Sequence, residues 1–219
     1  ITDRLEYQVM LGNNMSTLGV PASRLDNGLN TLSSALIWFP TGDFARGFNG
    51  QGWGDFEHHE EFSTRLAFHF SRSDENRESQ PGSDVFENTQ LRLSDGTVIF
   101  TPDLFGQGIS ISDARWRMTT VDGGFKYRGY SLEGEYYWRW LDNFRGTNTA
   151  GLATLFDHGF QMQGSAMIIP KTLQAYISHS RVFGQFGDPW DFRVGTNWFP
   201  FGNKVVRWNT EGLYLYKSP

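Results

Sequence analysis

The chain has 219 residues, a net charge of −5, no Cys, 25 Gly and 16% aromatic residues. A net negative charge offers no basic field to hold the phosphate backbone of a nucleic acid. The absence of Cys excludes disulfides, zinc ribbons and thiol nucleophiles. Mean hydropathy is −0.46, and no run approaches the roughly 18 apolar residues of a membrane-spanning helix. The richness in turn formers and ring side chains favours an all-β fold.

The predicted elements are strands with a period-2 pattern, in which one phase is apolar or aromatic and the other polar or charged. In chain order they cover residues 5–11, 32–39, 64–70, 119–128, 132–140, 160–168, 173–183, 190–198 and 205–216. The segment 132–140 is the clearest, because Tyr136 and Trp138 share one phase while Glu135 and Arg139 share the other. A helix would mix these two sets. Strands of a transmembrane barrel alternate in this way and average out as polar.

The connections between the predicted strands alternate in length. Residues 127–130, 169–172 and 201–204 form tight turns, whereas long extracellular loops are expected at about 72–114 and 142–159. Short turns on one side and long loops on the other are typical of an outer-membrane barrel. The connection over 40–61 is long, although it falls on the side where the other connections are short. The sequence therefore does not fix the register between the strands before and after it. No composition break marks a second domain, and residues 1–219 are expected to form a single β-barrel segment.

Aromatic residues gather at strand ends, as in Trp38-Phe39 and Trp198-Phe199. Trp and Tyr favour the boundary between hydrocarbon and water, so barrels carry two aromatic girdles. Aromatic residues are also common in strands of any kind. The charged residues in the opposite phase of these strands favour the interpretation as a barrel. The residues expected to face lipid are therefore Leu132, Tyr136, Trp138, Phe160, Met162, Ile168, Phe192 and Trp198.

Three motifs resemble one known family. They are GGFKYRGYSLEGEYY at 123–137, GDPWDFRVGTNWFP at 187–200 and RLEYQV at 4–9. In this order they resemble the phosphate-selective porin-like proteins of the O and P type, and the likeness covers most of the chain. The resemblance implies a transmembrane, antiparallel up-and-down β-barrel of about 16–18 strands in the outer membrane of a Gram-negative bacterium. It also implies a homotrimer in contact with the lipid bilayer and lipopolysaccharide, without nucleic acid.

The function implied by the resemblance is passive diffusion of small polar or anionic solutes, with no catalysis and no cofactor. The sequence supplies about half of the strands of such a barrel, and Lys217-Ser218-Pro219 looks like the entry into a loop. The expectation is a fragment of a longer porin that lacks the amino-terminal half and the last strand. Solute-binding residues are not carried over, because the constriction loop of the family comes from earlier strands.

The charged residues of the polar phase are the candidate pore-lining residues: Arg65, Lys126, Arg128, Glu133, Glu135, Arg139, Asp191, Arg193, Arg207 and Glu211. When Glu6 and Asp122 are added, six basic side chains stand against six acidic ones, with His69 near neutral. Fixed charges bias which ions linger in a wet lumen. The balanced set predicts little charge selectivity.

Two other classes of function remain open at this point. Glu133 and Glu135 lie two apart on one strand, and such paired carboxylates serve carbohydrate-active β-sheet enzymes as general acid and base. The simpler interpretation is that both are solvated in a lumen beside Arg139 and Lys126. A structural outer-membrane barrel that anchors an assembly is the third class.

Metal binding is considered at two acidic segments. Glu57-His58-His59-Glu60-Glu61 contains ligand types for zinc, but neighbours on an extended chain point to opposite sides. A solvated loop is therefore favoured. The acidic residues of the expected long loop lack the fixed spacing of a calcium motif and predict an exposed extracellular loop: Asp74, Glu75, Glu78, Asp84 and Glu87. No phosphate-cradling loop or nucleophile elbow occurs, and no metal or cofactor is expected.

Overall fold

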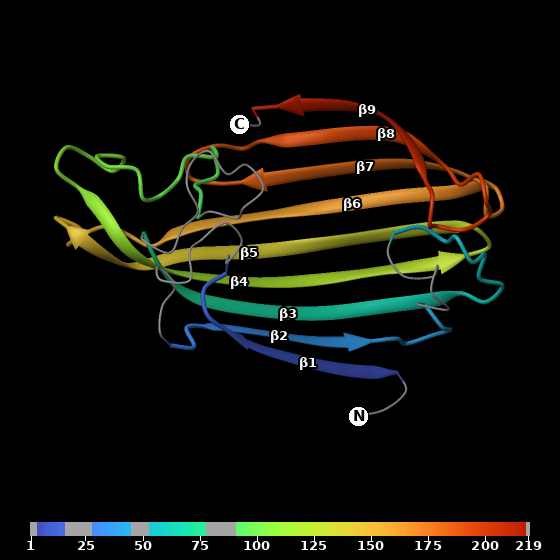
Figure 1. The fold of residues 1–219 in the computed structure, drawn as a ribbon, viewed down its shortest axis with the longest axis horizontal. Coiled ribbons are helices and arrows are strands. Elements are labelled where there is room, and N and C mark those ends of the chain that lie inside the picture. Colours follow the sequence, from blue (N-terminus) through green and yellow to red (C-terminus); the bar gives the residue numbers. More distant parts are fainter. Residues whose placement is uncertain (1–3, 16–27, 45–52, 78–90, 218–219) are drawn as a thin grey trace.

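The computed structural model describes residues 4–15, 28–44, 53–77 and 91–217. These residues form one antiparallel sheet of nine strands, and neighbours in the chain are neighbours in the sheet (Figure 1). The strands are β1 (Leu5–Gly12), β2 (Thr31–Trp38), β3 (Ser63–Asn76), β4 (Ser110–Tyr127), β5 (Tyr130–Thr147), β6 (Leu155–Ile169), β7 (Leu173–Phe183), β8 (Trp190–Trp198) and β9 (Trp208–Tyr216). The prediction of an all-β, up-and-down antiparallel sheet is confirmed. Across the described ranges, no helix is long and apolar enough to cross a membrane.

The sheet is open within the described residues. Strand β1 pairs only with β2, and β9 pairs only with β8. In Figure 1 these two strands form the opposite edges of the sheet. The closed barrel expected from the sequence is therefore not completed by these nine strands.

Strands β3, β4 and β5 extend further than their apolar alternation predicts. The connection between β3 and β4 is 77–109 instead of 72–114, and that between β5 and β6 is 148–154 instead of 142–159. In the β3 extension both phases are polar, and in the β4 and β5 extensions Arg115 and Asp142 interrupt the apolar phase, so the period-2 signal weakens. Ion pairs between strands join Arg115 to Asp74 and Arg117 to Asp142 across these extensions.

The strand register separates the side chains into an apolar face and a polar face. Seven of the eight residues predicted to face lipid lie on the apolar face, and the eighth, Ile168, falls at the register shift between Met167 and Ile169. Its large side chains are exposed; members between 43% and 53% exposed include Leu36, Trp38, Leu66, Phe68, Val121, Ile177, Val194 and Trp198. On the polar face, buried side chains include Thr120, Ser131, Ser165, Gln174 and Asn197. Leu213 and Leu215 near the end of β9 are apolar exceptions on the polar face.

Two connections cross the polar face, and we call them the first strap (53–62) and the second strap (91–105). In the second strap, Leu93 and Ile99 pack against Ile111 and Leu141 in a hydrophobic cluster. Its Ser94 Oγ also accepts a hydrogen bond of 3.0 Å from the Phe186 amide, between β7 and β8. The second strap thus spans from β4 and β5 to the β7–β8 connection.

The first strap crosses the polar face near the short connections. Phe56 is 2% exposed, and its ring meets the ring of Phe199 edge-on at 4.9 Å between centroids. The 40–61 connection is long because part of it folds over the sheet. The register from β2 to β3 is regular throughout, which resolves the question left open by the sequence.

The β4–β5 turn gives a test of local stability. Arg128 has φ 48° and Gly129 φ 85°, as in the two-residue turns that favour Asn-Gly. We expect Arg128→Asn to raise the free energy of unfolding by about 0.5–1 kcal/mol, because Asn tolerates positive φ better than Arg. Gly129→Ala is expected to lower it by about 1 kcal/mol or more, since a Cβ there would lie 3.2 Å from His58 Nδ1.

Urea unfolding followed by circular dichroism, on detergent-solubilised protein, measures both changes. Two variants with equal midpoints would contradict this assignment of the turn.

Candidate functional site

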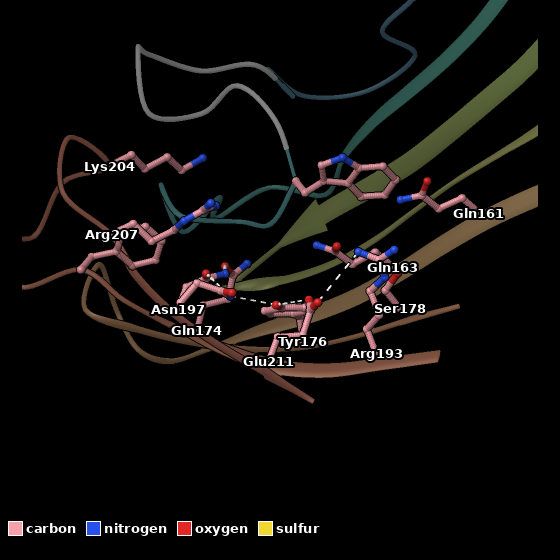
Figure 2. A pocket seen from close by; sticks show the side chains of 13 residues that line it. Gln161, Gln163, Gln174, Tyr176, Ser178, Arg193, Asn197, Lys204, Arg207 and Glu211 are labelled. Atoms are coloured by element: carbon pink, nitrogen blue, oxygen red, sulfur yellow. Dashed lines mark hydrogen bonds and ion pairs between the residues drawn. The ribbon is translucent and has the colours of Figure 1, made fainter. Parts of the chain in front are cut away.

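A cavity of about 540 Å³ lies on the polar face over strands β6 to β9 (Figure 2). The first strap contributes Trp53 to its wall, and the β8–β9 connection contributes Phe199, Lys204 and Arg207. The strand residues that line it are Gln161, Gln163, Gln174, Tyr176, Ser178, Arg193, Asn197, Asn209 and Glu211. Five of the lining residues carry side-chain amides, which both donate and accept hydrogen bonds.

Part of this lining is a connected hydrogen-bond chain. Asn197 Nδ2 donates to Gln174 Oε1 at 2.9 Å, and Asn209 Nδ2 donates to Asn197 Oδ1 at 3.0 Å. Asn209 Nδ2 also donates to the Tyr176 hydroxyl at 2.8 Å, which in turn donates to Glu211 Oε2 at 2.5 Å. Each member restrains the next, so the floor of the cavity over β7 to β9 is held in one arrangement.

Asp55 anchors the first strap to the sheet. This side chain is fully buried, and its carboxylate accepts hydrogen bonds from the amide of Gly129 at 2.7 Å and the amide of His59 at 3.1 Å. The His59 ring lies between Asp55 Oδ1, at 2.5 Å, and the carbonyl oxygen of Asp43, at 2.7 Å. The strap is therefore tied to the β4–β5 turn through a buried carboxylate.

Glu133 provides a second anchor for the first strap. Its Oε1 accepts a hydrogen bond of 2.8 Å from the Gly54 amide. Lys126 is fully buried on the neighbouring strand, and its Nζ lies 4.3 Å from the centre of the Phe44 ring. Burial lowers the pKa of Lys204, in the β8–β9 connection, while attraction by Glu133 opposes that change. Cations and carboxylates thus meet where the strap touches the sheet.

Farther along the polar face, the arginines are paired with carboxylates. Arg65 and His69 both contact Asp122, with His69 Nε2 at 2.6 Å from Asp122 Oδ2. Arg139 pairs with Asp157, a buried residue that the candidate set did not include.

Close to the cavity, Arg193 Nη2 lies 3.1 Å from Asp191 Oδ2, and Arg193 Nη1 lies 3.9 Å from Glu211 Oε1. These ion pairs agree with the equal numbers of basic and acidic side chains counted in the polar phase of the sequence. Each of the arginines Arg65, Arg139 and Arg193 has an acidic neighbour on the same face.

The sequence-predicted site residues separate into three groups. Those on the polar face of the strands are Arg65, Lys126, Glu133, Glu135, Arg139, Asp191, Arg193 and Glu211. Arg207 precedes β9 but still lines the cavity. Arg128 was wrongly placed in the lining: it is exposed in the β4–β5 turn, with its guanidinium over the Tyr127 ring at 5.1 Å. The turn removes it from the strand alternation on which the prediction relied.

Several residues of this face were missed by the sequence analysis. The amides Gln161, Gln163, Gln174 and Asn197 share the predicted polar phase, but only charged members of that phase were selected. The alternation itself could have found them. Trp53 and Asp55 belong to a connection, where no alternation exists to indicate burial.

The two acidic segments also differ from expectation. In 57–61, His58 is exposed but His59 is 4% exposed and held by Asp55, so the segment is not a fully solvated loop. Asp74 and Glu75 lie on β3 and not in a loop, whereas Glu78, Asp84 and Glu87 fall outside the described residues. In the described ranges, no group of three or more His, Asp or Glu side chains is arranged to hold a metal ion.

Comparison with known proteins finds no matching family model, no characterised protein of similar sequence and no solved structure that matches.

The buried anchor gives a prediction for the first strap. Asp55→Ala leaves the Gly129 amide and the His59 ring without their acceptor, and unsatisfied buried groups cost roughly 1–3 kcal/mol each. We expect faster hydrogen exchange at Gly54, His59 and Gly129, and proteolytic cleavage within 53–62. Mass spectrometry measures both changes. Glu60→Ala, at an exposed position of the same strap, is the control. Equal protection in the two variants would show that Asp55 does not hold the strap.

Proposed function

We propose that the protein is an outer-membrane channel of the porin type, through which small polar solutes diffuse passively. The observation that carries this proposal is the inverted distribution of side chains on the sheet. The face that bears Leu36, Ile177 and Val194 is exposed, whereas the straps and the buried polar residues lie on the opposite face. A water-soluble sheet would bury its apolar face, and a large exposed apolar surface marks contact with membrane or protein.

The strand ladder supports insertion in a bilayer. In lipid every backbone polar group must be satisfied within the protein, and an antiparallel sheet with short turns meets that demand along its strands. Strands of 9 to 18 residues from β3 to β9 are comparable with the roughly 9–11 residues that a tilted strand needs to span the hydrocarbon. The same demand requires partners for the free edges of β1 and β9, so we propose that they pair with further strands of a larger closed barrel.

Charges on the apolar face are concentrated toward its long-loop end. Arg115 and Arg117 lie there with their acidic partners, outside the stretch of β4 from Thr119 to Tyr127 that carries no charged side chain on this face. Arg181 lies near the corresponding end of β7, with its guanidinium 4.5 Å from the centre of the Phe183 ring. Charged side chains and Trp residues both favour the level of the lipid headgroups. Placing the headgroups at this end of the strands therefore accounts for the charges and for the nearby Trp138 and Trp140.

The polar face supports passage without catalysis. Its paired charges leave neither sign in large excess, and the two straps narrow the space over the sheet. The enzyme alternative has less support, because Glu133 already accepts the Gly54 amide of the first strap. The trimer, the lipopolysaccharide contact and the relation to the O and P type porins remain proposals drawn from the sequence resemblance.

Conductance across a planar bilayer tests the proposal. The full-length protein is expected to produce stepwise, ohmic current increments. In Arg139→Gln the charge of Asp157 loses its partner, so the reversal potential in a salt gradient should move toward cation selectivity by a small fraction of the Nernst potential. Arg139→Gln combined with Asp157→Asn should return the potential toward that of the unmodified protein.

Arg117→Gln, on the apolar face, is the matched control and should leave the potential unchanged. Absence of any conductance increment from folded protein would refute the channel proposal.

A further inference from the structure

The amide-rich cavity contains hydrogen-bonding groups that have no partner among the residues that the structure describes. Gln161, Gln163 and Ser178 line it from β6 and β7, yet none makes a side-chain hydrogen bond within the described residues. In contrast, the neighbouring Gln174 and Asn197 are fully engaged in the hydrogen-bond chain of the cavity floor. The free amides therefore offer paired donors and acceptors to a ligand with several hydroxyl groups.

Trp53 adds an aromatic surface to the same cavity. It is 40% exposed although the next residue, Gly54, is buried and donates its amide to Glu133. Gly54 has φ +90°, and a Cβ there would lie 2.0 Å from Gln174 Nε2. This close approach fixes the first strap against β7, and with it the backbone that carries Trp53. An indole beside amides is suited to the apolar face of a sugar ring.

Positive charge is placed at one end of the cavity. Lys204 and Arg207 lie together on the side away from Gln161 and Gln163 (Figure 2). Arg207 makes no ion pair or hydrogen bond with other described residues, whereas Arg193 is engaged by Asp191 and Glu211. The lining includes one carboxylate, Glu211, and the Tyr176 hydroxyl donates to it. An oxyanion is the group that complements Arg207 and Lys204.

We propose that this cavity is a binding subsite for an acidic saccharide, a sugar that carries a carboxylate. The sugar ring lies against Trp53, its hydroxyls bond to Gln161, Gln163 and Ser178, and its carboxylate is held by Arg207 and Lys204. A volume of about 540 Å³ falls within the range of about 300–1,000 Å³ common for small-molecule sites. The subsite would make acidic saccharides a class of solute for the channel, and in that respect the inference rests on the proposed function.

Simpler ligands use only part of the lining. A small inorganic anion would engage Arg207 and Lys204 but leave Trp53 and the free amides without a contact. A neutral sugar would engage Trp53 and the amides but leave the guanidinium of Arg207 unpaired. The acidic saccharide is the class that uses both ends.

Isothermal titration calorimetry on the full-length protein in detergent tests the subsite without requiring conductance. The probe is digalacturonate, with maltose as the neutral sugar and inorganic phosphate as the anion without a sugar. We expect saturable binding of digalacturonate, at least tenfold weaker in Trp53→Ala. Arg207→Gln should remove the preference for digalacturonate over maltose. Trp198→Ala, an exposed Trp on the apolar face, is the control and should bind like the unmodified protein.

Circular dichroism of every variant verifies that the sheet is intact. The inference is overturned if digalacturonate does not saturate, if phosphate binds as tightly, or if Trp53→Ala and Arg207→Gln leave binding unchanged. Binding by a protein that shows no conductance would uphold the subsite and refute the channel, and conductance without binding would do the reverse.

Discussion

The hydrogen-bonded ladder of the antiparallel sheet fixes the face on which every strand residue lies. Because side chains alternate along a strand and neighbouring strands are in register, a polar residue on one strand meets polar residues on the next. A shift by one residue would exchange the two faces and place Arg139 and Glu133 among the exposed aromatic residues. The cavity, the paired charges and the anchors of the straps all depend on this register.

The straps show how the polar face is organised once the register is set. Asp55 is 74 residues from Gly129, and Gly54 is 79 residues from Glu133. These contacts join the β2–β3 connection to the β4–β5 hairpin and bring Trp53 into the wall of the cavity. The second strap packs an apolar cluster at the opposite end of the strands. Between them, Gln174 and Asn197 keep the cavity floor polar and ordered.

Prediction from sequence succeeded where period-2 alternation was strong. The bounds of β7 and β8 coincide with the predicted segments. The alternation is unbroken in β8, whereas Arg181 and Val182 reverse it near the end of β7. It failed at the end of β3 and the start of β4, where Arg72, Asp74 and Arg115 place charge in the phase that is apolar elsewhere on these strands. It also treated 57–61 as solvated, because burial of His59 depends on contacts remote in the sequence. The amide cavity was missed because its members carry no charge.

Two adjacent residues of β7 distinguish a lipid-facing apolar face from any other arrangement of the sheet. The chain has no Cys, so Ile177→Cys and Ser178→Cys each introduce a single site for a nitroxide spin label. In lipid vesicles, we expect the label at 177 to collide mainly with oxygen dissolved in the bilayer. The label at 178 should collide mainly with a water-soluble nickel complex. Equal accessibility of both labels to nickel, or the reverse order, would contradict the assignment of the apolar face to lipid.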